Sequence, residues 1–91
     1  MLSVIKRRIE LANLFTEYTM IHEVYANIDF EMDRDAGTFV ILAKYDFDKT
    51  TLLYHMQKLF DMPIDIFVIT DPYSTLIKGN KIIWKAETWY I

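Results

Sequence analysis

A stretch of ten residues with strict alternation of apolar and other side chains most constrains how this chain folds. Between Glu23 and Met32 every second residue is apolar. This period of two predicts a half-exposed β-strand, since successive side chains of a strand point to opposite faces of its sheet. The polar segment Asp33–Gly37 then predicts a turn, and the run Thr38–Phe47 predicts a second strand because it is rich in β-branched and aromatic residues. We expect the two strands to form an antiparallel hairpin.

Helices are predicted before and after this hairpin. The first runs from about Val4 to Tyr18 with Ser3 as its cap, and the second runs from about Lys49 to Phe60 with Asp48 as its cap. The apolar residues of the second helix fall in an arc of about 120°, whereas those of the first cover about 220°. Two interpretations of the wide arc remain open. Arg8, which falls inside it, extends past its aliphatic neighbours, or the helix packs on two sides and the second side meets a partner.

The last third of the chain completes a mixed sheet. Ile64–Thr70 is apolar on both faces except at Asp65, as expected of a central strand. A short helical segment is predicted over Tyr73–Lys78, and a short strand around Ile82–Trp84. We therefore expect one α/β (α+β) domain of 91 residues, with about four strands, packed helices and the order α-β-β-α-β-α-β. Because the third strand follows a helix, it should form one parallel pair; a ferredoxin-like arrangement is the competing topology.

Composition argues against several classes of function. The chain has no cysteine, which excludes a disulfide framework, a thiolate metal site and a cysteine nucleophile. Its net charge of −3 offers no basic surface for nucleic acid. Both glycines, Gly37 and Gly79, are isolated, so a glycine-rich phosphate loop is missing. No nucleophile–base pattern is formed by the serines and histidines, which are Ser3, Ser74, His22 and His55.

The N-terminal residues indicate where the protein resides. Met1–Arg8 places basic residues after a short apolar stretch, the reverse of a signal peptide. No run approaches the roughly 18 to 20 apolar residues that span a bilayer. We therefore expect a cytoplasmic protein without a membrane partner, and a phage or mobile-element origin is left open.

Carboxylates are the polar residues with useful spacing. Asp29 and Glu31 lie two apart on a predicted strand, so both side chains project from one face, and Asp65 lies on a strand that can share the sheet. Three such groups could hold Mg²⁺ for two-metal phosphoryl transfer. The alternative, which we favour, is a solvated strand face together with one aspartate that is buried at the sheet edge and held by hydrogen bonds.

The segment Leu52–Phe67, followed by Leu76–Trp84, resembles the latter half of minimal nucleotidyltransferase domains. In that family a helix leads into a strand of the type Pro-Val-Asp-Leu-Val, and a glycine followed by a short apolar strand comes later. The resemblance covers roughly Thr38 to Trp84, and it implies that Asp65 matches the third metal-binding carboxylate of the family.

The family's two signature motifs are missing from this chain. No Gly-Ser element is present, and Gly37–Leu42 stands where the Asp-x-Asp strand is expected. An alignment on Asn27–Glu31 restores two acids, but it disturbs the spacing to the following helix. The resemblance thus implies a similar scaffold with a degenerate site, and a shared fold does not transfer function.

Three hypotheses of function follow. The first is a non-catalytic interaction or regulatory protein, such as an inhibitor or antitoxin-like partner, that needs no cofactor and binds a protein or a second copy of itself. Its motivation is the wide arc of the first helix and the aromatic end of the chain, because tryptophan and tyrosine are enriched at interfaces. A core completed by the chain's own tail is the alternative. The candidate contact residues are Arg8, Phe15, Tyr18, Trp84, Trp89 and Tyr90.

The other two hypotheses use the acidic residues. One is a nucleotidyltransferase-like enzyme with Mg²⁺ as its cofactor and Asp29, Glu31 and Asp65 as metal ligands. The other is an acidic mimic of nucleic acid that offers an acidic face to a basic partner. That face would consist of Asp29, Glu31, Asp33 and Asp35.

Overall fold

A computed structural model of the chain describes residues 4–26, 37–60 and 63–86. Within these ranges it contains two α-helices, one 3₁₀ turn and four strands, which confirms the expected α+β class. In chain order the elements are α1 (Val4–Thr16), β1 (Ile21–Ala26), β2 (Gly37–Ala43), α2 (Thr50–Gln57), β3 (Ile64–Ile69), η1 (Thr75–Ile77) and β4 (Lys81–Lys85).

The four strands form one mixed sheet in the order β3-β2-β1-β4. β1 is antiparallel to both β2 and β4, and β2 is parallel to β3. The predicted hairpin and the single parallel pair after a helix are therefore confirmed. The order α-β-β-α-β-β differs from the β-α-β-β-α-β order of a ferredoxin-like domain.

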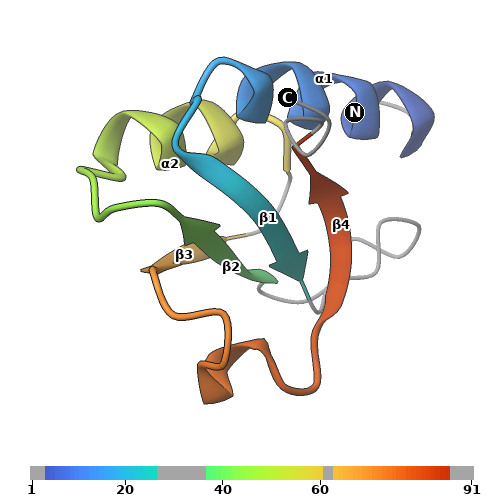
Figure 1. Cartoon of the computed structure of the whole chain (residues 1–91). Coiled ribbons are helices and arrows are strands. Elements are labelled where there is room, and N and C mark those ends of the chain that lie inside the picture. Colours follow the sequence, from blue (N-terminus) through green and yellow to red (C-terminus); the bar gives the residue numbers. More distant parts are fainter. Residues whose placement is uncertain (1–3, 27–36, 61–62, 87–91) are drawn as a thin grey trace.

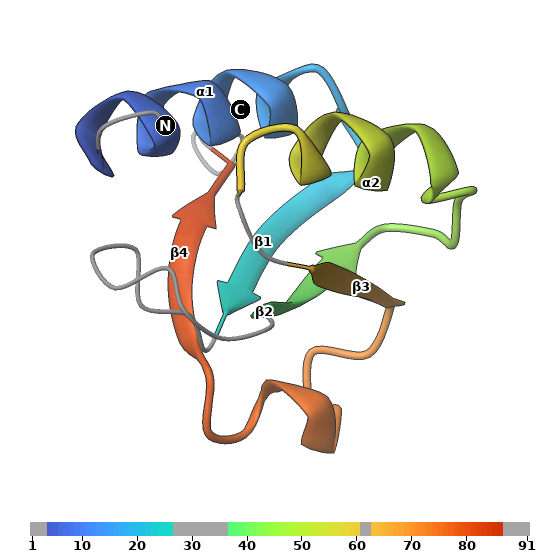
Figure 2. The same cartoon turned by 180° about the vertical axis from the view of Figure 1, so that it is seen from behind.

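Both helices pack on the same face of the sheet (Figure 1). The connection from β3 to β4, which contains η1, runs on the side of the sheet away from the helices, as the reverse view also shows (Figure 2). We call this second side the helix-free face. Among the described residues, both α-helices therefore belong to one layer, and the other face of the sheet carries no α-helix.

The core lies between the helices and the sheet. Leu11 and Phe15 of α1 and Leu52 and Met56 of α2 belong to one buried apolar cluster. From the sheet the cluster takes alternate residues of each strand, as a two-residue period requires, except between Ile21 and Val24, where the pairing of β1 with β2 is irregular. These are Ile21, Val24, Ala26, Phe39, Ile41, Ile64 and Ile66.

The predicted central strand is an edge strand, so that prediction was wrong. β3 lies at the end of the sheet, and the strand buried on both faces is β2, where Phe39 and Ile41 face the helices and Val40 and Leu42 are buried on the helix-free face. β3 is apolar on both sides because its helix-facing residues enter the core while Phe67 and Ile69 meet the helix-free face. Apolar residues on both faces thus do not distinguish an edge strand from a central one.

The boundaries of the predicted elements shift by a few residues. α1 ends at Thr16 rather than Tyr18, because the last turn tightens into bonds from Glu17 N to Leu14 O and from Tyr18 N to Phe15 O. The third predicted helix is only the 3₁₀ turn η1. Residues 27–32 of the first predicted strand and the predicted cap Ser3 lie outside the described residues.

The cap position of α2 is Lys49, which makes no side-chain capping bond, so the predicted cap is one residue too early. Asp48 nevertheless bonds to the first residue of the helix. Its Oδ1 accepts hydrogen bonds from the backbone N of Thr50 at 2.9 Å and from the Thr50 hydroxyl at 2.7 Å. These two bonds lower the pKa of the Asp48 carboxyl, since they stabilise its charged form.

Arg7, and not Arg8, is the cation that α1 buries. The Arg7 side chain is 1% exposed, and its Nε donates a hydrogen bond of 2.8 Å to the carbonyl of Leu59. Its guanidinium carbon lies 5.0 Å from the ring centre of Phe60. Leu59 follows the C-terminal end of α2, where carbonyls lack helical partners and a positive charge is favourable. Arg7 thus fastens α1 to the end of α2, whereas Arg8 is exposed.

We expect Arg7→Ala to lower the free energy of unfolding by about 2–3 kcal/mol, because it leaves a buried carbonyl without this donor and a void beside Phe60. The neighbouring Arg8→Ala is the matched control and should change it by less than about 0.5 kcal/mol. Urea unfolding followed by circular dichroism measures both values. If both variants lowered the free energy of unfolding equally, the conclusion that Arg7 is the buried cation would be contradicted.

Candidate interaction surfaces

An unbroken line of apolar side chains crosses the helix-free face. The strand registers pair Phe67 with Val40, Val40 with Tyr25 and Tyr25 with Ile82, so all four strands contribute one residue. We call these four residues the apolar row. Val40 in the middle is 1% exposed, whereas the two ends, Phe67 and Ile82, are 42% and 48% exposed. The row is therefore buried at its centre and open at both ends.

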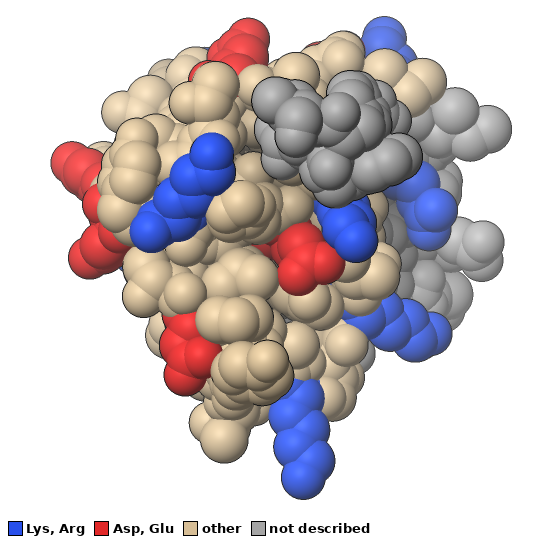
Figure 3. Space-filling view, in the orientation of Figure 1, with Lys and Arg blue, Asp and Glu red and all other residues tan. Residues whose placement is uncertain are grey.

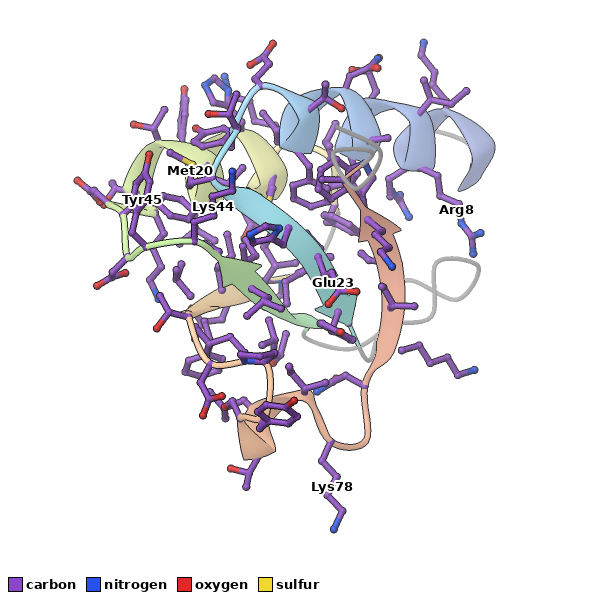
Figure 4. The ribbon with its side chains drawn as sticks, in the orientation of Figure 1. Arg8, Met20, Glu23, Lys44, Tyr45 and Lys78 are labelled. Carbon is purple, nitrogen blue, oxygen red and sulfur yellow. The ribbon has the colours of Figure 1, made fainter. Side chains whose placement is uncertain are left out.

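Polar groups beside the row hold Tyr25 in place. The Tyr25 hydroxyl donates a hydrogen bond of 2.9 Å to Glu23 Oε1. Partial burial raises the pKa of Tyr25, and the neighbouring Glu23 carboxylate raises it further. Glu23 is paired in register with Lys85 of β4, and its side chain lies over β1 (Figure 4).

Charged side chains on this side of the molecule are scattered singly. In the space-filling view most of the surface is uncharged, and neither sign gathers into a large patch (Figure 3). Large exposed apolar side chains also occur in the connection between β3 and β4, at Tyr73 and Leu76. Among the described residues visible in this view, uncharged side chains therefore predominate over charged ones.

The outer edge of β3 is capped by side chains. Gln57 Oε1 accepts a hydrogen bond of 3.0 Å from the backbone N of Ile64, and Asp65 Oδ1 accepts one of 2.8 Å from the backbone N of Ile66. The Lys49 ammonium donates to the carbonyl of Ile66 and lies 4.0 Å from Asp65 Oδ1. Three of the backbone groups that an added strand would use are therefore already bonded.

The outer edge of β4 is protected in another way. Its register with β1 shifts between Val24 and Tyr25, which leaves Ile83 without a partner in β1. Lys81 and Lys85 stand at the two ends of the strand. Irregular pairing and lysines are the usual features by which edge strands avoid pairing with other chains.

A groove lies between α1, the start of β1 and the end of β4. Its volume is about 490 Å³, which is within the range of ligand-sized cavities. Its walls include the ring of Trp84, whose centre lies 5.6 Å from that of Phe15, and the ring of Tyr18, which lies 5.8 Å from Phe47. The described residues that line it are Ala12, Thr16, Tyr18, Thr19, Ile21, Trp84, Lys85 and Ala86.

The predicted contact residues fall into different places. Phe15 is fully buried in the chain's own core, so its ring is not available to a partner in this structure. Tyr18 and Trp84 are half-buried and line the groove. Arg8 projects from α1 toward solvent (Figure 4). The last two, Trp89 and Tyr90, lie outside the described residues.

Of the predicted acidic site, only Asp65 can be placed. Its carboxylate accepts a hydrogen bond from the backbone N of Ile66, as the favoured interpretation expects, but its side chain is 59% exposed and not buried at the edge as that interpretation supposed. The others, Asp29, Glu31, Asp33 and Asp35, lie outside the described residues. Within the part of the chain that the structure describes, no three His, Cys, Asp or Glu side chains are grouped so that they could hold a metal ion.

Sequence reasoning missed Arg7 and the apolar row. Arg7 stands four residues before Leu11 and eight before Phe15, on the stripe that α1 buries, and this spacing was the available signal. The row depends on strand register, which the sequence alone left undetermined. Among the helices of residues 4–26, 37–60 and 63–86, none combines the length and the apolarity needed to cross a lipid bilayer.

Comparisons with known proteins give no relative for this chain. No family model matches its sequence, and neither a curated protein nor a solved structure matches it. The resemblance to minimal nucleotidyltransferase domains therefore stays a prediction.

The pKa of Tyr25 tests the geometry beside the row. We expect the phenol to titrate above its ordinary value of about 10, and Glu23→Gln to lower its pKa only in part, because burial is the larger cause. Since the pKa is raised in the folded chain, stability is retained below pH 10 or so and weakens as the pH rises through the folded value. Ultraviolet titration, with Tyr25→Phe subtracted, measures the shift. An ordinary pKa in the wild-type chain would contradict this geometry.

Proposed function

We propose that the protein is a non-catalytic interaction or regulatory protein, of the inhibitor or antitoxin type, that works by binding another protein. The observation that carries the proposal is the apolar row, with its exposed ends Phe67 and Ile82 on the helix-free face. Aromatic and aliphatic side chains that converge on a buried centre are characteristic of the core of a protein interface.

Both edge strands are protected against pairing with another strand, which favours a contact through the helix-free face of the sheet. Side chains cap backbone groups of β3, and β4 combines a shifted register with terminal lysines. A partner would therefore pack flat on the helix-free face. Leu76 and Tyr73, in the connection between β3 and β4, are further exposed apolar side chains of the molecule.

Replacing the ends of the row tests the proposal. We expect Phe67→Gln combined with Ile82→Thr to reduce partner binding about tenfold or more, since removing two apolar contacts at an interface costs at least about 1.4 kcal/mol. The wild-type chain is immobilised and exposed to extract from its native host, and retained proteins are quantified by mass spectrometry. Sedimentation velocity of each chain shows whether the partner is a second copy.

The matched control is Tyr54→Gln, which replaces a side chain that is 59% exposed on α2, the helical side of the molecule. A partner that binds through the row is retained by the wild-type and control chains and lost by the double variant. Equal retention by all three chains would contradict the proposal. So would the absence of any retained protein while the wild-type chain sediments as a monomer.

A further inference from the structure

Along the outer edge of β3, side chains of the same chain bond to backbone groups of the strand. In a parallel pair, alternate residues of a strand direct both backbone groups toward the same neighbour. The backbone N of Gly37 in β2 bonds to the carbonyl of Pro63, so odd-numbered residues face β2. Ile64 and Ile66 therefore direct their backbone groups outward, where an added strand would meet them.

Side chains bond three of these outward groups, which are the two amides and the carbonyl of Ile66. Gln57, at the end of α2, takes the amide of Ile64, and Asp65 takes the amide of Ile66. Lys49, just before α2, reaches the Ile66 carbonyl from the other end of the helix. We call Lys49, Gln57 and Asp65 the latch. Two of its three members come from the ends of α2, so the helix that covers β3 also closes its edge.

We propose that the outer edge of β3 is a strand-pairing site for a second copy of this chain, and that the latch holds it closed in the monomer. The three side chains are weak barriers individually. Lys49 and Asp65 are 41% and 59% exposed, and an exposed ion pair of this kind contributes little to stability. Backbone groups of a second β3 could displace them without opening the core.

Register and charge favour a second copy at this edge. An antiparallel pair centred on Ile66 sets Ile64 opposite Val68 of the second copy and Asp65 opposite its Phe67, so no like charges meet. The Phe67 side chains of the two copies would then be diagonal neighbours across the seam, within reach of each other, so that the two apolar rows meet there. The corresponding pair of two β4 strands, centred on Ile83, would set Lys81 opposite Lys85 of the second copy, which is unfavourable.

The experiment removes the latch while leaving the buried core unchanged. The triple variant Lys49→Met, Gln57→Leu and Asp65→Ala takes away all three capping groups. The matched control Lys58→Met, His55→Leu and Glu10→Ala removes the same kinds of group from exposed positions on the two helices. We expect sedimentation velocity to detect dimers of the triple variant below about 500 µM, at least tenfold tighter than any association of the wild-type or control chains.

A mixed sample of isotope-labelled and unlabelled triple variant locates the contact. In the proposed pair, residues 65 and 67 of opposite copies form a position without backbone hydrogen bonds, where the α-carbons approach to about 4.5 Å. We therefore expect an intermolecular nuclear Overhauser effect between the α-protons of Ala at position 65 and Phe67. A folded triple variant that stays monomeric overturns the proposal, as does a dimer whose contacts lie at β4 or elsewhere.

Two further measurements keep the test decisive if the triple variant loses its fold. The double variant Lys49→Met and Gln57→Leu retains Asp65, and we expect it to dimerise more weakly through the same edge. In the wild-type chain, the latch should slow hydrogen exchange of the Ile64 and Ile66 amides about tenfold or more relative to free amides. Unprotected amides at both positions would overturn the proposal. The proposed function does not depend on this result, because it is tested at Phe67 and Ile82 together in a chain with its latch intact.

Discussion

The packing of both helices on one face of the sheet is the constraint on which the rest of this structure depends. It gives one side of the sheet a complete core, in which Arg7 joins α1 to the end of α2. On the opposite side the described residues place no α-helix, so side chains of neighbouring strands shield the middle of the sheet there. Burial of β2 on both faces follows from this arrangement, since Val40 and Leu42 are covered without a helix.

The apolar row is a direct consequence of covering β2 in this way. Neighbouring strands shield Val40 with Tyr25 on one side and Phe67 on the other, and Ile82 continues the line to the sheet edge. The same side chains that protect the centre are exposed at the ends. A sheet with an apolar face and open edges would tend to pair with other chains, so the latch on β3 and the lysines of β4 are what such a surface requires.

Periodicity in the sequence predicted most helices and strands correctly, but it did not predict which strand lies at the sheet edge or which side chains form the candidate surfaces. The alternation around Val24 and Ala26 identified the hairpin, and the helix before Ile64 implied a parallel strand, because both signals are local. The place of β3 at the sheet edge was predicted wrongly, since a strand with two apolar faces looks the same in either position. The sequence did not identify Arg7 as buried, because a charged residue is expected at the surface even when its spacing places it on the buried side of the helix. Its partner, the carbonyl of Leu59, lies 52 residues away and leaves no trace in a local pattern.

The candidate surfaces depend on register, which no single segment encodes. Phe67, Val40, Tyr25 and Ile82 become neighbours only when the strand order and all three registers are known. Asp65 carried the resemblance to nucleotidyltransferases in the sequence, and in the fold its carboxylate caps the amide of Ile66. An aspartate held by hydrogen bonds was one of the two interpretations that the sequence allowed. The structure adds a second contact, because the Lys49 ammonium lies 4.0 Å from Asp65 Oδ1.

The exposure of the helix-free face in solution is the central claim, and methyl NMR with a soluble paramagnetic agent measures it most directly. The structure predicts strong relaxation enhancement for the methyl groups of Ile82 and Leu76, and little for those of Val40 and Ile41. Protection of the Ile82 methyl groups as complete as that of Ile41 would show that the row is covered by the chain itself, and would contradict its role as a contact surface.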